Sequence, residues 1–266
     1  MKRVGKKYLL FFLISYIIRQ MTRYFCRIEY NGAGFCGWQA QNNQRSVQGE
    51  FERTLDKLFG KKIEVTASGR TDAGVHALDQ CIHFDLESVV PCDRLKIALN
   101  DMLPKDIAIK KVKIVSDKFN ARYAVKKKTY LYRLQCGYEK TALDGDKITQ
   151  IKPMLSLEKM NEIKDIFLGK HNFKGYANAK AQVRDFEREI FDIKITQKKN
   201  QFEFRITGNG FLYNMVRIIV GSFVDFSLDK RTKEELLLAF EKQERMFAGR
   251  TMPPQGLYLE KTYYRR

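Results

Sequence analysis

Residues 67–76 form the stretch whose side chains are best suited to chemistry. They read Ala-Ser-Gly-Arg-Thr-Asp-Ala-Gly-Val-His, so two glycines bracket a short polar loop that holds Arg70 and Asp72. Such a loop can place a carboxylate at the rim of a sheet beside a guanidinium, which keeps the carboxylate ionised and oriented. An ionised aspartate in a cleft can act as a nucleophile or as a base. An ordinary Asp-Ala-Gly turn with an arginine salt bridge fits the same pattern.

A second candidate is Arg217, which is the only charged residue in the first part of a long apolar segment, residues 211–226. An arginine in such a place must find a partner or extend its head group to water. A buried carboxylate is the economical partner, and Asp72 is a candidate. The alternative is a surface arginine on the flank of a helix.

The third candidate segment combines basic and aromatic residues. Lys126, Lys127 and Lys128 precede Tyr130 and Tyr132 on one expected strand. This combination suits RNA, because lysines meet phosphates and an aromatic ring meets an unstacked base. A solvated charge run followed by core tyrosines is an equally good interpretation.

The composition favours an anionic partner and a reducing environment. The chain has 266 residues, with 49 Lys and Arg against 31 Asp and Glu, which gives a net charge of +18. Such a charge attracts polyanions, of which nucleic acid is the commonest, although lysines can also serve solubility alone. Five cysteines without a CxxC pair and only three histidines argue against a metal site and a disulfide framework. The cytoplasm is therefore the expected location.

The first 20 residues do not fit this picture. Basic residues precede an apolar run at 8–18, which resembles a signal peptide or a short anchor. The run is too short to span a membrane comfortably, and no small-x-small cleavage site follows it. We expect 1–20 to be a dispensable extension, or Met21 to be the functional start. A basic protein tethered to a membrane is the alternative.

The hydrophobic periodicity, together with the turn and cap residues along the chain, predicts two similar halves, each with the order β-α-β-β-α-β. Residues 21–118 form the first half and 119–266 the second, with the seam near 116–126. Ser46 and Gly60 cap the first helix, Ser156 opens a later helix that Gly169 closes, and Thr232 with Glu235 predicts a capping box. The predicted strands are 23–30, 62–68, 78–84, 107–115, 127–136, 189–196, 201–207 and 256–264, and the predicted helices are 46–60, 93–102, 156–169, 211–226 and one that follows Thr232.

These elements predict an α+β fold. Each half is expected to make a ferredoxin-like antiparallel sheet with helices on one face, and the two sheets to join around a central basic cleft. The same order of elements also describes RNA recognition motifs, so a non-catalytic RNA-binding protein of two ferredoxin-like modules is an alternative. No strand carries the aromatic signature of those motifs.

At residues 68–78, Ser-Gly-Arg-Thr-Asp-Ala-Gly-Val-His-Ala-Leu, the chain resembles the TruA family of tRNA pseudouridine synthases. Further segments agree in order and spacing, so the resemblance covers about 22–264. The chain departs from the family where Lys128 and Thr129 replace frequent arginines and Tyr123 replaces the usual phenylalanine. The other matching segments are 30–39, 46–48, 119–123, 129–132, 209–221 and 256–259.

The resemblance implies a fold, a reaction and a set of site residues. Asp72 matches the catalytic aspartate, Arg70 the arginine beside it, and Arg217 the arginine that pairs with it. Tyr130 matches the aromatic residue that packs on the target base, and Leu257 matches an apolar wall of the pocket.

The resemblance implies the pseudouridine synthase fold. It also implies that the protein isomerises uridine to pseudouridine at positions 38, 39 and 40 in the anticodon arm of tRNA. Such an isomerase needs no redox step, so the resemblance implies no cofactor and no metal. It also implies a homodimer that grips one tRNA.

Overall fold

A computed structural model describes residues 21–139, 142–181 and 183–264. The elements of the first half run from the first strand to the fourth. They are β1 (Thr22–Tyr30), η1 (Gly32–Gly34), α2 (Val47–Phe59), β2 (Thr66–Ala67), β3 (His76–Leu86), α3 (Cys92–Met102) and β4 (Ile107–Val115).

The second half contains more elements than its sequence pattern predicts, because short strands and 3-10 turns lie between the longer ones. They are β5 (Val125–Cys136), β6 (Thr149–Ile151), α4 (Leu157–Glu162), η2 (Lys164–Phe167), β7 (Gly169–Asn172), η3 (Lys174–Tyr176), β8 (Glu187–Lys198), β9 (Gln201–Gly208), α5 (Met215–Ser227), α6 (Lys233–Glu241), η4 (Arg245–Phe247), η5 (Pro254–Gly256) and β10 (Leu257–Tyr264).

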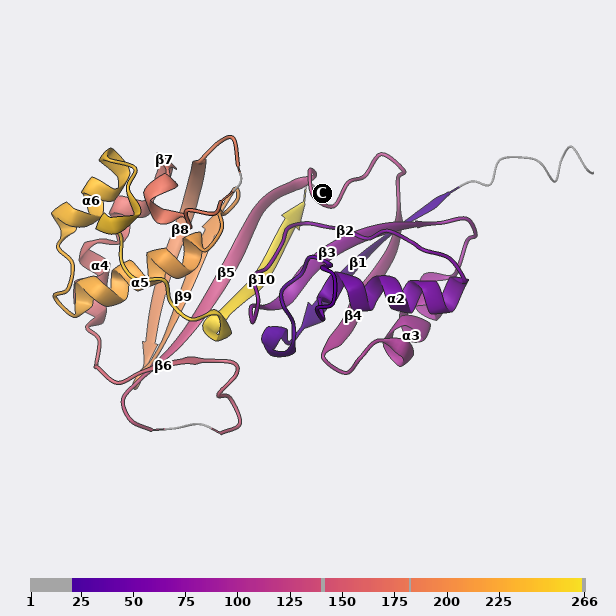
Figure 1. Cartoon of the computed structure of the whole chain (residues 1–266), viewed down its shortest axis with the longest axis horizontal. Helices are drawn as coiled ribbons and strands as arrows, with labels where there is room; N and C mark the ends of the chain where they lie inside the picture. The colour runs from indigo at the N-terminus through magenta and orange to yellow at the C-terminus, as the bar shows by residue number, and fades with distance from the viewer. Residues whose placement is uncertain (1–20, 140–141, 182, 265–266) are drawn as a thin grey trace, which may run out of the picture.

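The strands form one sheet that crosses the whole molecule in the order β4-β1-β3-β10-β5-β9-β8-β7. Figure 1 shows α2 and α3 beside the N-terminal strands and α4, α5 and α6 beside the C-terminal strands, with β5 and β10 in the middle. The α+β class predicted from the sequence is confirmed. The two expected sheets are joined edge to edge into a single sheet.

The last strand, β10, makes this junction. It pairs in parallel with β3 and antiparallel with β5, and Leu259 lies opposite both Ala77 of β3 and Tyr130 of β5. The start of β3 is therefore only two strands away from the middle of β5. This pairing brings the loop before β3 close to the aromatic residues of β5.

Local signals place several elements correctly. The Ser46 side chain accepts a hydrogen bond from Gly49 N at the start of α2, and Gly60 ends the helix with a φ of 68°. A left-handed residue at this position suits glycine, which has no Cβ to clash. The capping box of Thr232 and Glu235 is also present at α6.

Three predicted elements differ from the structure. Of the strand expected at 62–68 only Thr66–Ala67 pairs, although Ile63 and Val65 are buried, because an alternating pattern reports burial rather than backbone pairing. The helix expected from Ser156 to Gly169 breaks at Ile163 into α4 and η2. The helix expected at 211–226 begins only at Met215, because the residue before it takes a left-handed conformation.

None of the helices that the structure describes is both long and apolar enough to cross a membrane. The apolar run at 8–18 lies outside the described residues. The dispensability of 1–20 therefore stays a prediction.

Candidate active site

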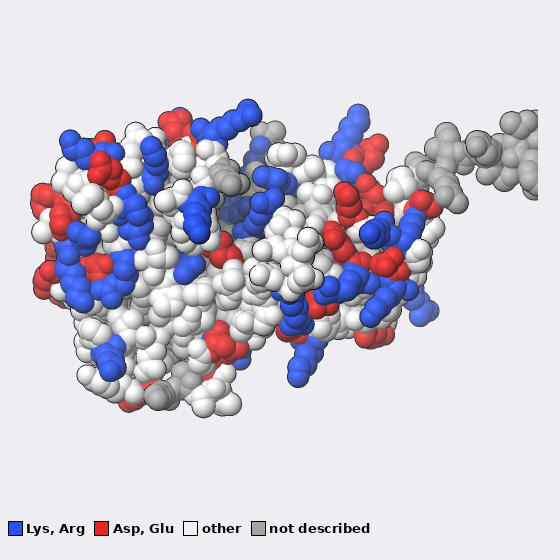
Figure 2. All heavy atoms as spheres, in the orientation of Figure 1, with Lys and Arg blue, Asp and Glu red and all other residues white. Residues whose placement is uncertain are grey.

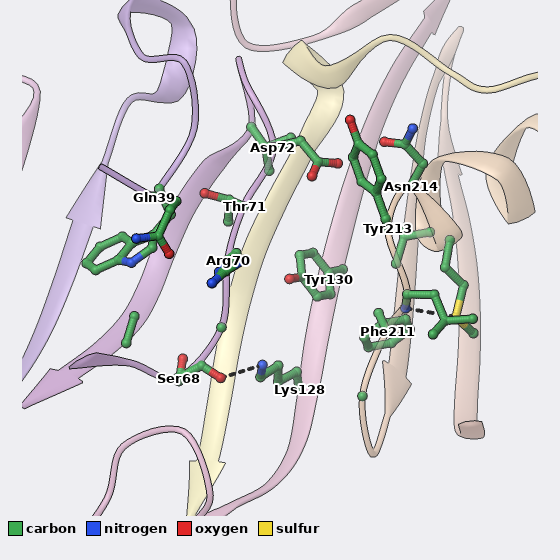
Figure 3. Close-up of a pocket in the computed structure, with 18 of the residues that line it drawn as sticks. Gln39, Ser68, Arg70, Thr71, Asp72, Lys128, Tyr130, Phe211, Tyr213 and Asn214 are labelled. Atoms are coloured by element: carbon green, nitrogen blue, oxygen red, sulfur yellow. Dashed lines mark hydrogen bonds between the residues drawn. The ribbon is translucent and has the colours of Figure 1, made fainter. Parts of the chain in front are cut away.

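A cavity of about 840 Å³ lies where the two halves meet. Its walls come from the loop between β2 and β3, from β5, from the segment before α5 and from the start of β10. Figure 3 shows side chains from these segments on both sides of β10 and β5, around one cavity. Among the described residues, the lining holds one acidic residue and five basic ones, namely Asp72 against Arg70, Arg122, Lys128, Lys180 and Arg188. Figure 2 shows Lys and Arg side chains gathered at the hollow between the halves.

The loop that carries Asp72 is held in place by its neighbour Thr71. The Thr71 hydroxyl lies 2.8 Å from the buried Tyr30 hydroxyl, and its carbonyl accepts a hydrogen bond of 3.0 Å from Trp38 N. Val75 N donates to the carbonyl of Asp72 itself at 3.2 Å. The backbone before the aspartate is therefore held by the segment that follows β1, and the backbone after it by a hydrogen bond within the loop.

Glycines make this close contact possible. A Cβ added to Gly32 would lie 2.0 Å from Val75 O, and one added to Gly37 would lie 2.7 Å from Thr71 O. Gly37 also has a φ of 106°, which L side chains rarely adopt. The glycines after β1 therefore let one backbone segment pack directly on the loop of Asp72.

Arg217, in the first turn of α5, is the arginine that approaches Asp72. Its Nη1 lies 3.8 Å from Asp72 Oδ2, and both side chains are largely shielded from solvent. The same guanidinium donates to Met252 O at 2.6 Å and to Asn214 Oδ1 at 2.8 Å. Burial raises the pKa of the Asp72 carboxyl above its usual value, and the positive charge of Arg217 opposes this shift.

Arg70 does not pair with Asp72 in this structure. It lines the cavity, is exposed and makes no ion pair with any described residue. In Figure 3 the Asp72 carboxylate points toward Tyr213 and Asn214, whereas Arg70 lies on the other side of Thr71. Alternate residues of an irregular loop need not share a face, so the spacing of two does not bring these side chains together.

Tyr130 and Leu257 form the apolar part of the cavity. Tyr130 is buried, and its ring meets the ring of Phe211 edge to face with 5.1 Å between the centroids. Burial raises the pKa of the Tyr130 phenol and so further favours its neutral form. Leu257 is also buried and belongs to the cavity lining.

The three lysines at the start of β5 have different surroundings. Lys126 is exposed, and Lys127 places its ammonium 4.8 Å from the centre of the Tyr263 ring. Only Lys128 lines the cavity, where its Nζ donates to Ser68 O at 2.7 Å. Successive side chains of a strand point to opposite faces, which separates Lys128 from Lys127.

The sequence interpretation missed several residues of the cavity. The sequence predicts a helix over 211–226, whereas Phe211, Tyr213 and Asn214 form the loop before it. Asn214 carried a usable signal, because a polar residue ahead of an apolar helix often lies at its cap. Lys180 lies in a turn and Arg188 at the start of β8, and nothing in the local sequence marks either as a cavity residue.

Metal and disulfide chemistry were not expected from the cysteine and histidine pattern. Within the described ranges, no group of three His, Cys, Asp or Glu side chains is arranged to hold a metal ion. The five cysteines are free thiols.

Comparisons with known proteins agree on one family. The family model described as tRNA pseudouridine synthase matches residues 27–124 and 164–265. A tRNA pseudouridine synthase A from Geobacillus sp. (strain WCH70) is 43% identical over 240 residues, which cover 90% of this chain and 97% of the relative. The protein of the same name from Bacillus subtilis (strain 168) is 40% identical over 241 residues, covering 90% of this chain and 98% of the relative.

A chain from a solved structure described as a Cbf5-Nop10-Gar1 complex is similar with a TM-score of 0.36 and 10% identity. The match covers 89% of this chain and 58% of that chain. A similarity at this level carries no conclusion about the site.

Proposed function

The chain belongs to the tRNA pseudouridine synthase family, and we propose that it isomerises uridine to pseudouridine at positions 38, 39 and 40 in the anticodon arm of tRNA. One observation carries the assignment of chemistry to this cavity. Asp72, the one carboxylate among the described lining residues, is partly buried beside Arg217, and the other charged residues described in the lining are basic.

The reaction requires the target uridine to leave the RNA helix, because its reacting atoms are otherwise covered by stacked neighbours. We propose that the flipped uracil packs on Tyr130 and against Leu257, with its ribose toward Asp72. The bond between N1 and C1′ breaks, the uracil turns, and a bond between C5 and C1′ forms. C5 then loses its proton and N1 gains one, so the reaction is redox-neutral.

Asp72 acts on the ribose in one of two ways that fit its position. It attacks C1′ as a nucleophile, or it removes a ribose proton as a base. Both need the ionised carboxylate, and Arg217 favours that form electrostatically. Arg70 has no acidic partner among the described residues, which leaves its guanidinium available to fill the space that the flipped base vacates.

The RNA backbone is proposed to lie over the basic residues around the cavity, with Lys126, Lys127 and Lys128 among its contacts. A net charge of +18 supports binding to a polyanion. We further propose that two copies of the chain grip one tRNA, and that the protein works in the cytoplasm. A protein that only binds RNA has no need for a shielded carboxylate beside an arginine, so the site favours the enzyme over the non-catalytic alternative.

The decisive experiment incubates the protein with unmodified tRNA transcripts and maps pseudouridine position by position. Product at 38, 39 or 40 supports the proposal. Product elsewhere in the tRNA would keep the chemistry and overturn the assigned positions. A well-folded protein that makes no pseudouridine in any tRNA would overturn the assignment of activity.

A further inference from the structure

We propose that Lys128, with Arg122 beside it, forms a subsite for one of the two phosphodiester groups that flank the target uridine. The proposal rests on the proposed function, because it assumes that a flipped nucleotide occupies the cavity. In this proposal Lys128 binds the substrate directly, unlike the two lysines before it.

The Lys128 ammonium is held at a defined place in the cavity wall. Its Nζ donates to Ser68 O at 2.7 Å. It also lies directly over Gly69, where an added Cβ would come within 2.5 Å of Nζ. The absence of a side chain at Gly69 therefore leaves the room that the ammonium fills.

The ammonium has hydrogen-bonding capacity to spare. It carries three N–H donors, and Ser68 O is its only hydrogen-bond acceptor among the described residues. Among the described residues, no carboxylate lies close enough to form an ion pair with Lys128 or with Arg122. Two donors are thus available to a ligand that enters the cavity.

The electrostatic environment favours an anion at this place. Burial, together with the nearby positive charge of Arg122, lowers the pKa of Lys128 to about 8. Lys128 is half-buried, and a partly desolvated cation beside a second cation is costly unless an anion compensates it. A phosphate group would supply the missing negative charge and accept the free donors of both side chains.

The position along β5 relates this subsite to the target base. Lys128 and Tyr130 are two residues apart on one strand, so they share a face at a spacing of about 7 Å. Thr129 points to the other face, where its hydroxyl lies 2.8 Å from that of Thr207. In Figure 3, Tyr130 lies between Asp72 and Lys128 along the cavity. A nucleotide stacked on Tyr130 therefore has an acid at one end and a cation at the other.

The test uses tRNA in which a single methylphosphonate replaces the phosphate on the 5′ or the 3′ side of the target uridine. This change removes one negative charge and keeps the shape of the backbone. The dissociation constant and the rate of pseudouridine formation are measured for the unmodified protein, for Lys128→Met and for Lys127→Met. Lys127 is the matched control, because it is the neighbouring lysine but lies outside the cavity lining.

We expect Lys128→Met and one of the two methylphosphonates each to weaken binding roughly tenfold, as loss of one charge-assisted contact does. When Lys128→Met binds the tRNA with that methylphosphonate, the affinity should be no weaker than with either change alone, because both changes remove the same contact. For Lys127→Met, the fold-loss in affinity from the substitution and the fold-loss from the methylphosphonate should multiply, because the two changes remove different contacts. If the losses multiply for Lys128→Met at both flanking positions, the subsite does not exist.

Two further measurements keep the result interpretable. A thermal melt checks each variant, and Lys128→Gln serves as a second variant that keeps a polar head group if the methionine does not fold. Binding is measured independently of turnover, so the two proposals fail separately. Absence of any pseudouridine overturns the proposed function, whereas multiplying losses in binding overturn the subsite alone.

Discussion

Arg217 Nη1 lies 3.8 Å from Asp72 Oδ2, although the two residues come from opposite halves of the chain. The guanidinium is oriented by Met252 O and Asn214 Oδ1 rather than by the carboxylate itself. It therefore contributes positive charge to Asp72 without enclosing the carboxylate, which stays open toward the cavity. This arrangement suits a carboxylate that must be both ionised and accessible.

The pH dependence of the reaction should respond to Arg217. Burial has raised the pKa of Asp72, and the positive charge of Arg217 opposes that rise. Arg217→Gln removes the charge, so the pKa of Asp72 should rise further. Since the reaction needs the ionised carboxylate, the acid limb of the kcat/KM profile should move to higher pH.

The control for this measurement is Arg205→Gln, which removes an arginine paired with Glu203 and Glu260 outside the cavity. Its acid limb should coincide with that of the unmodified protein. A loss of rate in Arg217→Gln that is equal at every pH would show that Arg217 acts through packing and not through its charge.

Asp72→Asn should separate catalysis from binding. Asparagine has the size of aspartate and tolerates the same loop, but it cannot act as an anionic nucleophile or base. Pseudouridine formation should fall below detection while the affinity for tRNA changes little, since distributed Lys and Arg contacts supply most of it. Asp56→Asn on the exposed face of α2 makes the same chemical change and should leave activity unaltered. Near-normal turnover by a well-folded Asp72→Asn protein would sink the catalytic assignment.

Gly37→Ala should damage the site through the backbone. Its φ of 106° strains any L side chain, and the new Cβ would meet Thr71 O at 2.7 Å. Gly60→Ala provides the comparison, because its φ is also positive but nothing lies within 4 Å. We expect Gly60→Ala to cost about 1–2 kcal/mol of stability with normal specific activity. Gly37→Ala should cost more and also slow the reaction; equal activity in the two variants would contradict this expectation.

Binding of tRNA should weaken steeply with salt. Each phosphate neutralised by Lys or Arg releases counterions, so the logarithm of the association constant falls linearly with the logarithm of salt concentration. For roughly five or more contacts, the loss between low and moderate salt spans orders of magnitude. Titrations of labelled tRNA at a series of salt concentrations measure the slope, and a flat response would exclude electrostatics as the basis of binding.

Removal of residues 1–20 should leave the folded protein and its activity intact. The described sheet begins with β1 at Thr22, and the family model matches from residue 27. Soluble yield, thermal melting, cell fractionation and pseudouridine formation should be compared for the two forms. If the full chain is found in the membrane fraction and the shortened one does not fold, the segment is an essential anchor.

Local sequence was sufficient for most of the long elements and for the loop that carries Asp72. Ser46 and Gly60 bracket α2 as their cap chemistry predicts, and Thr232 with Glu235 forms the expected capping box. These features depend on neighbouring residues, whose interactions are determined by helix geometry alone. The strands other than the short ones were likewise visible from alternation, because it records which face is buried.

The arrangement of the site was decided by tertiary structure. The last strand, β10, lies between β3 and β5, and only this pairing places Tyr130 near the loop of Asp72. It is also tertiary packing that brings Arg217 to Asp72 and leaves Arg70 without an ion pair to any described residue. Such contacts join residues far apart in the chain, so they depend on strand order and register. Neither quantity is encoded in the local periodicity from which the elements themselves could be predicted.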